Sequence, residues 1–323
     1  MKSNRIKKYL FASICAVLCS FSSVMAQQES QYSMYMFNQL LINPAVTGTE
    51  DYMDAKLGYR NQWMGFEGHP QNFYGTFHTP FKKLKSEFDD VKPLAWHGLG
   101  GFATGEVTGP LNKYKLYGSY AYHIPLSNTM VLSLGTFLGF QNYYVNRDRL
   151  DFKDNVPDAA VNGSVSVISP DGSVGGWLYS RQLYVGLSIL QIFNNKVKVS
   201  DNGSPEGKLN RHYFFTAGYK IKLDEQWALV PSVLVKGLSP APVQFDINLK
   251  ARYQEKLWFG ASYRNKDAVI ALLGMTIDQK IDVGLAYDIS ISRFRKYNNG
   301  SIEVLVGYHF PTKKLAPSHS YFW

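Results

Sequence analysis

A period of two dominates the sequence downstream of its N-terminal region. From Gln244 to Tyr253, and again from Ile281 to Ile289, apolar side chains alternate with polar or small ones. This alternation is typical of β-strands that have one apolar and one polar face. Beyond residue 26 no helical period competes with it, and no segment reaches the 18 or so apolar residues of a membrane-spanning helix. The chain is therefore expected to be all-β.

The alternating runs predict about fourteen antiparallel strands. The connections between them are of unequal length: 224–226 and 278–280 are tight, whereas 146–171, 191–210 and 291–299 are long. Short turns at one end and long loops at the other are typical of an outer-membrane barrel. The expected strands are 53–61, 72–79, 96–106, 112–123, 129–145, 172–179, 182–190, 211–222, 227–236, 244–253, 256–264, 268–277, 280–290 and 300–310.

The N-terminus has the pattern of an export signal. Four basic residues precede an apolar stretch from Tyr9 to Val24, and Val24-Met25-Ala26 forms a cleavage site. A membrane anchor is the alternative, but the stretch is short for a span. Cleavage after residue 26 would remove both cysteines, Cys15 and Cys19, which excludes disulfides and cysteine metal sites from the mature chain.

Cleavage would also lower the formal net charge from +9 to +5. Basic residues are dispersed among acidic ones, so the sequence gives no argument for a nucleic-acid partner.

A soluble β-sandwich would alternate in the same way, so the period alone does not define the architecture. The export signal, the absence of a spanning helix and the alternating last strand favour a transmembrane outer-membrane β-barrel in contact with lipid, since only helices and closed barrels satisfy their backbone groups there. Aromatic pairs near strand ends suit the two membrane interfaces. These pairs are Tyr143-Tyr144, Trp177-Tyr179 and Tyr213-Phe215.

No motif supports catalysis, a cofactor or a metal ion. Residues 98–103 match G-x-G-x-x-A, but no helix follows them, and glycines of a barrel strand explain the match. Residues 260–264 resemble a nucleophile elbow, but Arg264 stands where the last glycine belongs. The seven histidines show no paired ligand spacing. We therefore expect a non-enzymatic protein without a cofactor.

Charged residues on the polar strand faces should point into the lumen if the apolar faces meet lipid. Their mixed signs suggest a solvated or salt-bridged interior more than a selectivity filter. The candidate lumen charges are Asp246, Lys250, Arg252, Asp282, Asp288 and Glu303.

The segment from Tyr35 to Gly48 is apolar enough to need cover, yet asparagine and proline interrupt it. From physical reasoning alone it is either a plug folded into the lumen or a docking segment in the periplasm. The candidate residues for these two roles, together with three from the first expected hairpin, are Tyr35, Met36, Phe37, Asn38, Asn43, Pro44, Arg60, Gln62 and Trp63.

Two blocks of sequence, "QYSMYMFNQLLINPAVTG" and "YRNQWMGFEGHP", resemble the opening signature of the PorP/SprF family of Bacteroidota outer-membrane proteins. The dense signature covers residues 31–80, and Met34 and Val46 depart from it. The matching residues are Gln31, Ser33, Tyr35, Met36, Phe37, Asn38, Asn43, Pro44, Ala45, Gly48, Arg60, Gln62, Trp63, Gly65, Gly68 and Pro70.

The resemblance implies a part of the type IX secretion and gliding machinery. Its partners would be a secreted cargo or adhesin with a type IX sorting domain and other machinery components. The implied organisation is a signal peptide (1–26), a family-signature segment (27–50), a barrel (51–310) and a C-terminal tail (311–323). A porin or a channel for apolar solutes is the alternative, because the inner face is polar and so many strands leave room for a lumen.

Overall fold

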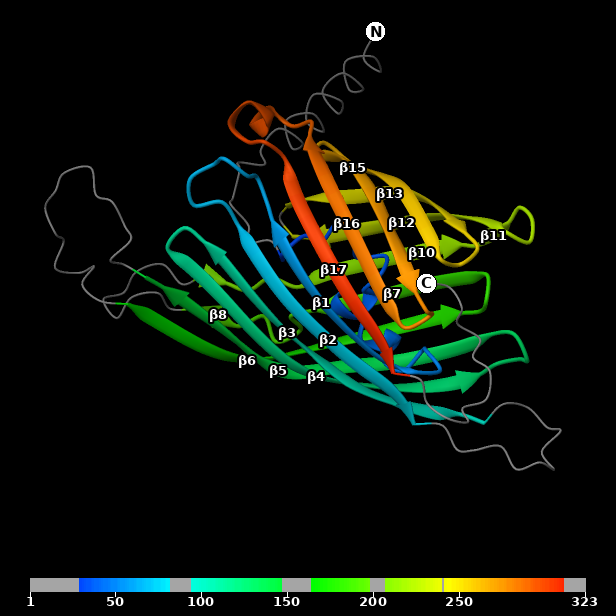
Figure 1. Cartoon of the computed structure of the whole chain (residues 1–323). Coiled ribbons are helices and arrows are strands. Elements are labelled where there is room, and N and C mark those ends of the chain that lie inside the picture. The colour runs from blue at the N-terminus through cyan, green and yellow to red at the C-terminus, as the bar shows by residue number, and fades with distance from the viewer. Residues whose placement is uncertain (1–28, 82–93, 147–163, 198–206, 240, 311–323) are drawn as a thin grey trace, which may run out of the picture.

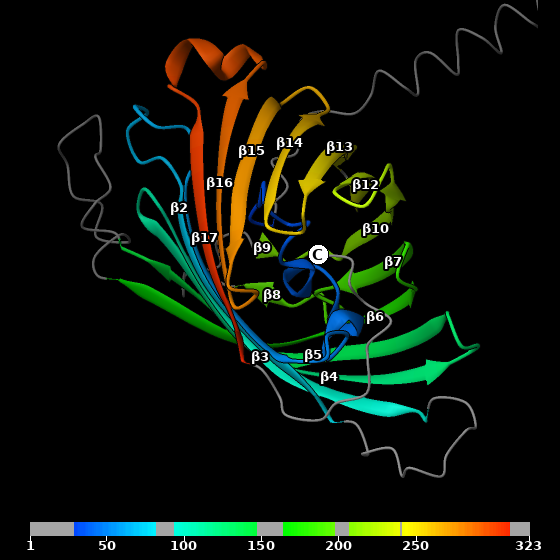
Figure 2. The same ribbon diagram turned by 45° about the vertical axis from the view of Figure 1, so that its right-hand side comes forward.

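The computed structural model describes residues 29–81, 94–146, 164–197, 207–239 and 241–310. The expected signal peptide and the C-terminal tail lie outside these ranges. Within them, fourteen antiparallel strands form a closed barrel (Figures 1 and 2), which confirms the predicted fold. The ring closes where β1 pairs with β17 and where β10 pairs with β12. No helix in the described residues is long and apolar enough to cross a membrane.

The strand bounds lie close to those expected from the alternation. The short strands β8 (Lys196–Val197) and β9 (Gly207–Lys208) pair only with each other, and β11 (Ile221–Lys222) extends β10 along β12. The barrel strands are β1 (Met53–Asn61), β2 (Gln71–Phe81), β3 (Trp96–Thr108), β4 (Leu111–Pro125), β5 (Val131–Val145), β6 (Val165–Tyr179), β7 (Leu183–Leu190), β10 (His212–Tyr219), β12 (Trp227–Leu238), β13 (Ala241–Tyr253), β14 (Leu257–Arg264), β15 (Ala268–Ile277), β16 (Ile281–Ser290) and β17 (Ser301–Phe310).

Strand β6 begins seven residues earlier than expected. Pro170, Asp171 and Gly172 suggest a turn in the sequence, yet they continue the strand. Pro170 is tolerated because the side of β6 away from β5 has no ladder partner at this point in the described residues, so its missing N–H breaks no hydrogen bond. The Asp171 side chain accepts a 2.8 Å hydrogen bond from the hydroxyl of Tyr117 inside the barrel.

The outward faces of the strands carry the apolar side chains. Leu57, Leu116, Leu138 and Leu187 are each more than 60% exposed, which in water would be unfavourable but in a bilayer forms a lipid-facing surface. The predicted aromatic girdle is only partly correct. Tyr213 and Phe215 face outward, whereas Tyr143, Trp177 and Tyr179 face the lumen and are buried. Successive side chains of a strand point to opposite faces, so the position of each ring in this alternation decides whether it faces lipid or the lumen, and its proximity to a strand end does not.

The interior is occupied by the chain's own N-terminal region. Residues 29–50, here called the lumenal segment, lie inside the ring of strands and include two short 3-10 helices, η1 (Gln39–Leu41) and η2 (Pro44–Val46) (Figure 2). Its apolar side chains between Met34 and Ile42 form one core cluster with inward-facing barrel residues such as Phe137 and Trp258, and Ala45 and Val46 belong to a second cluster with Trp177. Most of its residues are buried.

Candidate functional site

The N-terminal half of the lumenal segment is held by a network of buried charges. The hydroxyl of Ser33 donates to Asp288 at 2.8 Å, and its backbone N–H donates to Glu303 at 2.6 Å. Arg60 donates to both carboxylates, at 2.7 Å and 3.3 Å, and to the Ser33 hydroxyl at 2.8 Å. Strands β1, β16 and β17 therefore meet the segment at Ser33, where each charge has an opposite partner.

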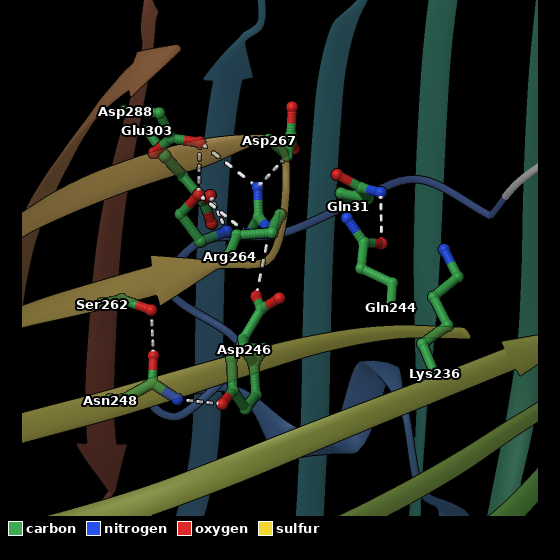
Figure 3. Close-up of polar contacts among 12 residues, drawn as sticks. Gln31, Lys236, Gln244, Asp246, Asn248, Ser262, Arg264, Asp267, Asp288 and Glu303 are labelled. Atoms are coloured by element: carbon green, nitrogen blue, oxygen red, sulfur yellow. Dashed lines mark hydrogen bonds and ion pairs between the residues drawn. The ribbon is translucent and has the colours of Figure 1, made fainter. Parts of the chain in front are cut away.

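A second arginine continues this network along the wall (Figure 3). Arg264 of β14 donates to Asp246 at 3.0 Å and to Asp288 at 3.4 Å, and lies 3.6 Å from Asp267. Arg264 was not among the predicted site residues, since in the sequence it stands out only where it interrupts the nucleophile-elbow pattern of residues 260–264. The alternation of β14 could have found it, because Ser262 and Arg264 share the face opposite to Phe259 and Tyr263. Ser33 had no such signal, since the lumenal segment has no regular period.

The C-terminal half of the segment is held by the side chain of Asn43 and by its own backbone carbonyl groups. The side-chain amide of Asn43 donates to the carbonyl oxygens of Gly176 and Leu187, at 3.1 Å and 3.2 Å. Ser133 donates to Ala45 O at 2.7 Å, and the ring of His123 lies 2.8 Å from Thr47 O. Barrel side chains thus satisfy carbonyl groups that no regular secondary structure would pair.

Inward-facing glycines let the segment approach the wall. A Cβ on Gly135 of β5 would lie 2.5 Å from the backbone nitrogen of Ala45. A Cβ on Gly175 would overlap the Asn43 side chain, and one on Gly98 would overlap the Thr47 carbonyl. The glycines of 98–103 are thus explained in part by close packing of Gly98 against the segment.

This packing predicts a matched pair of variants. Gly135→Leu should lower the free energy of unfolding by about 1–3 kcal/mol, because the added side chain must displace η2 or the strand. Gly176→Leu carries the same change on the outward face, where the nearest atom to a Cβ is 3.8 Å away, and should change the stability by about 0.5 kcal/mol or less. Urea unfolding in detergent micelles measures both, and equal effects would contradict the close packing.

The N-terminal end of the segment is fixed by Glu29. Its carboxylate pairs with Lys115 and accepts a 2.7 Å hydrogen bond from Gln191. Burial alone would raise the pKa of Glu29, but Lys115, with His212 and Lys236, lowers the pKa to about 2. Glu29 is therefore ionised throughout the neutral range, and these partners retain their counter-charge.

The candidate residues of the segment lie inside the barrel. Tyr35, Met36, Asn38, Asn43 and Pro44 are buried. Phe37 is half-buried, stacks on Trp258 with ring centroids 3.9 Å apart, and lies 4.3 Å from the Lys250 ammonium.

The three candidate residues from the first hairpin lie in two different places. Arg60 faces the lumen, whereas Gln62 and Trp63 belong to the β1–β2 loop at the barrel mouth. There they line a cavity of about 380 Å³ together with Glu29, Ser30 and Gln31.

The six lumen charge candidates all lie on inward faces but form two groups. Asp246, Asp288 and Glu303 belong to the network around Arg60 and Arg264. Lys250, Arg252 and Asp282 lie toward the other end, where Asp282 accepts a hydrogen bond from Thr276 and pairs with His309 at 2.8 Å. In the described residues, no group of three or more His, Cys, Asp or Glu side chains is arranged to hold a metal ion.

A closed barrel with an apolar outer surface and a polar, charge-paired interior defines an outer-membrane β-barrel protein. Within this class, the profile described as Type IX secretion system membrane protein PorP/SprF matches residues 24–308, and the chain belongs to this family. It is thus an outer-membrane component of type IX secretion, which confirms the resemblance. Family and fold are those of a secretion-system membrane protein, not of a known enzyme class.

Solved structures of similar shape include outer-membrane proteins and channels. The CymD monoaromatic hydrocarbon channel is 12% identical, with 85% of this chain and 92% of that chain covered and a TM-score of 0.48. The Acinetobacter baumannii outer membrane protein Omp33 is 8% identical, with 81% and 100% covered and a TM-score of 0.46. Similarities this low do not assign a channel activity to this chain. No curated protein matches the sequence.

Proposed function

We propose that this protein is a plugged barrel that binds or anchors a secreted cargo or adhesin at the cell surface through the partner's sorting domain. The observation that carries this proposal is that the lumenal segment fills the middle of the barrel. Two cavities beside it, lined in part by Tyr35 and Leu41, hold only about 30 Å³ each, roughly the space of one water molecule. A filled lumen suits an anchor better than a diffusion channel, and the family supplies the link to secretion.

An aromatic cluster on two neighbouring loops offers a binding surface for such a partner. Trp63 and Phe66 of the β1–β2 loop each contact Phe294 of η5 (Arg293–Tyr297), with ring centroids 5.1 Å and 5.0 Å apart. Phe66 is 43% exposed and Tyr297 is 67% exposed. Exposed aromatic side chains that are rigidly held are typical of the residues that dominate protein interfaces.

Affinity capture of the tagged protein from detergent-solubilised membranes tests the proposal. Type IX cargo or machinery proteins should co-purify, and a double variant, Phe66→Ala with Tyr297→Ala, should recover at least about tenfold less of them, as expected for loss of interface hot spots. Leu223→Ala, in a turn at the opposite end of the barrel and 58% exposed, is the matched control and should leave recovery unchanged. Capture of no such protein by the intact chain would contradict the proposal.

A further inference from the structure

The two ends of the lumenal segment form hydrogen bonds with residues at different ends of the barrel strands. Glu29 N donates to His212, the first residue of β10, at 3.1 Å, and Glu29 O accepts from Lys236, near the end of β12, at 3.0 Å. At the other end of the segment, Gly48 N donates to His78, near the end of β2, and Gly48 O accepts from Trp96, the first residue of β3, both at 3.1 Å.

These two sets of contacts lie at opposite ends of the barrel. His212 pairs with Leu238 and Leu190, the last residues of β12 and β7, so it marks one rim. Met53, where β1 begins, pairs with Phe310, where β17 ends, and both mark the other rim. Since the segment must join β1 at the second rim and starts at the first, it crosses the whole lumen (Figure 2).

Connection lengths orient the barrel in the membrane. On the rim that holds Met53, five of the six connections are short, namely 126–130, 180–182, 220–226, 254–256 and 278–280, and the sixth, 82–95, is long. On the opposite rim, 109–110, 239–240 and 265–267 are tight, but the other four connections, 62–70, 146–164, 191–211 and 291–300, are longer and include the two longest of the barrel. Short turns face the periplasm in outer-membrane barrels and long loops face the outside. The rim at Glu29 is therefore the cell-surface rim.

The geometry points to an arrangement in which the N-terminal end of the lumenal segment is accessible at the cell surface, although β1 begins on the periplasmic side. Glu29, Ser30 and Gln31 line the 380 Å³ cavity at this rim together with loop residues such as Trp63 and Lys266. The end is fixed there, because Ser30 bonds to Glu106 and the Gln31 amide donates to Gln244 at 2.7 Å. Residues 29–31 are thus part of the face that this protein presents to the exterior.

Cysteine labelling of intact cells tests this arrangement. The only two cysteines of the chain are Cys15 and Cys19, so a Cys15→Ser/Cys19→Ser background carries none. Into it we would introduce Ser30→Cys, with Lys296→Cys in the outer η5 loop as the surface control and Glu225→Cys in a periplasmic turn as the protected control. The probe is a membrane-impermeant maleimide, applied before and after permeabilisation.

The expected result is that the Ser30→Cys and Lys296→Cys proteins are labelled on intact cells, whereas Glu225→Cys is labelled only after permeabilisation. Since Ser30 is half-buried, an epitope inserted between residues 28 and 29 gives a second measurement, and antibody should detect it on intact cells. Labelling of Ser30→Cys only after permeabilisation, or an epitope hidden on intact cells, would overturn the inference. Either result is independent of whether a cargo is captured.

Discussion

A barrel that lacks residues 30–47 is expected to conduct ions steadily in a planar bilayer, whereas the intact protein should stay closed. In the intact protein, Met34, Leu40 and Leu41 occupy the middle of the barrel and are at most 6% exposed. A barrel of this strand number leaves an interior larger than its own wall side chains fill. The strand ladders do not involve the segment, so the wall should close without it.

The control deletes η5, residues 293–297, which removes outer-loop residues but leaves the lumenal segment in place. This variant should stay as closed as the intact protein. Should the truncated chain fail to fold, Gly135→Leu provides a milder displacement of η2 and should raise the frequency of openings. Steady conductance from the intact protein, equal to that of the truncated one, would contradict the plug and favour the porin alternative.

Arg60→Met is expected to lower the free energy of unfolding by about 3–5 kcal/mol, the cost of removing one partner from a buried ion pair. Arg60 is 1% exposed and bridges Asp288 and Glu303. Among the described residues, its loss leaves Glu303 without an ion-pair partner and leaves Asp288 paired with Arg264 alone. Urea unfolding in micelles, followed by the electrophoretic mobility of the folded barrel, measures the change.

Two further variants isolate the ionic contribution of Arg60. Arg295→Met, in an exposed loop, should change the stability by about 0.5 kcal/mol or less. Combining Arg60→Met with Glu303→Gln removes the uncompensated charge and should be less destabilising than the sum of the two single changes. A loss below about 1 kcal/mol for Arg60→Met would show that water replaces the guanidinium, and that the network does not hold the wall together.

The barrel itself could be predicted from the sequence because every strand repeats a local rule. Alternation in β13 and β16 fixes which side chains face lipid, and it placed Asp246, Lys250 and Asp288 on the inward face. The prediction was wrong at Pro170, where residues typical of a turn continue strand β6. It was also wrong at Trp177, which was assigned to the membrane interface because it is aromatic and near a strand end, although its position in the alternation turns it into the lumen. In both cases the outcome depends on how β6 is placed against its neighbours in the barrel, which residue type alone does not reveal.

The sequence by itself determined an all-β chain that closes into a lipid-facing barrel, and it identified the family through residues 31–80. Only the tertiary structure decided where the segment from Tyr35 to Gly48 lies, because its irregular backbone has no period and its hydrogen bonds are made to distant strands. Ser33, Arg60 and Arg264 likewise form one network only after β1, β14 and the segment converge in the lumen. Local periodicity specifies a strand's faces, whereas contacts between segments far apart in the chain arise only when the ring of strands closes.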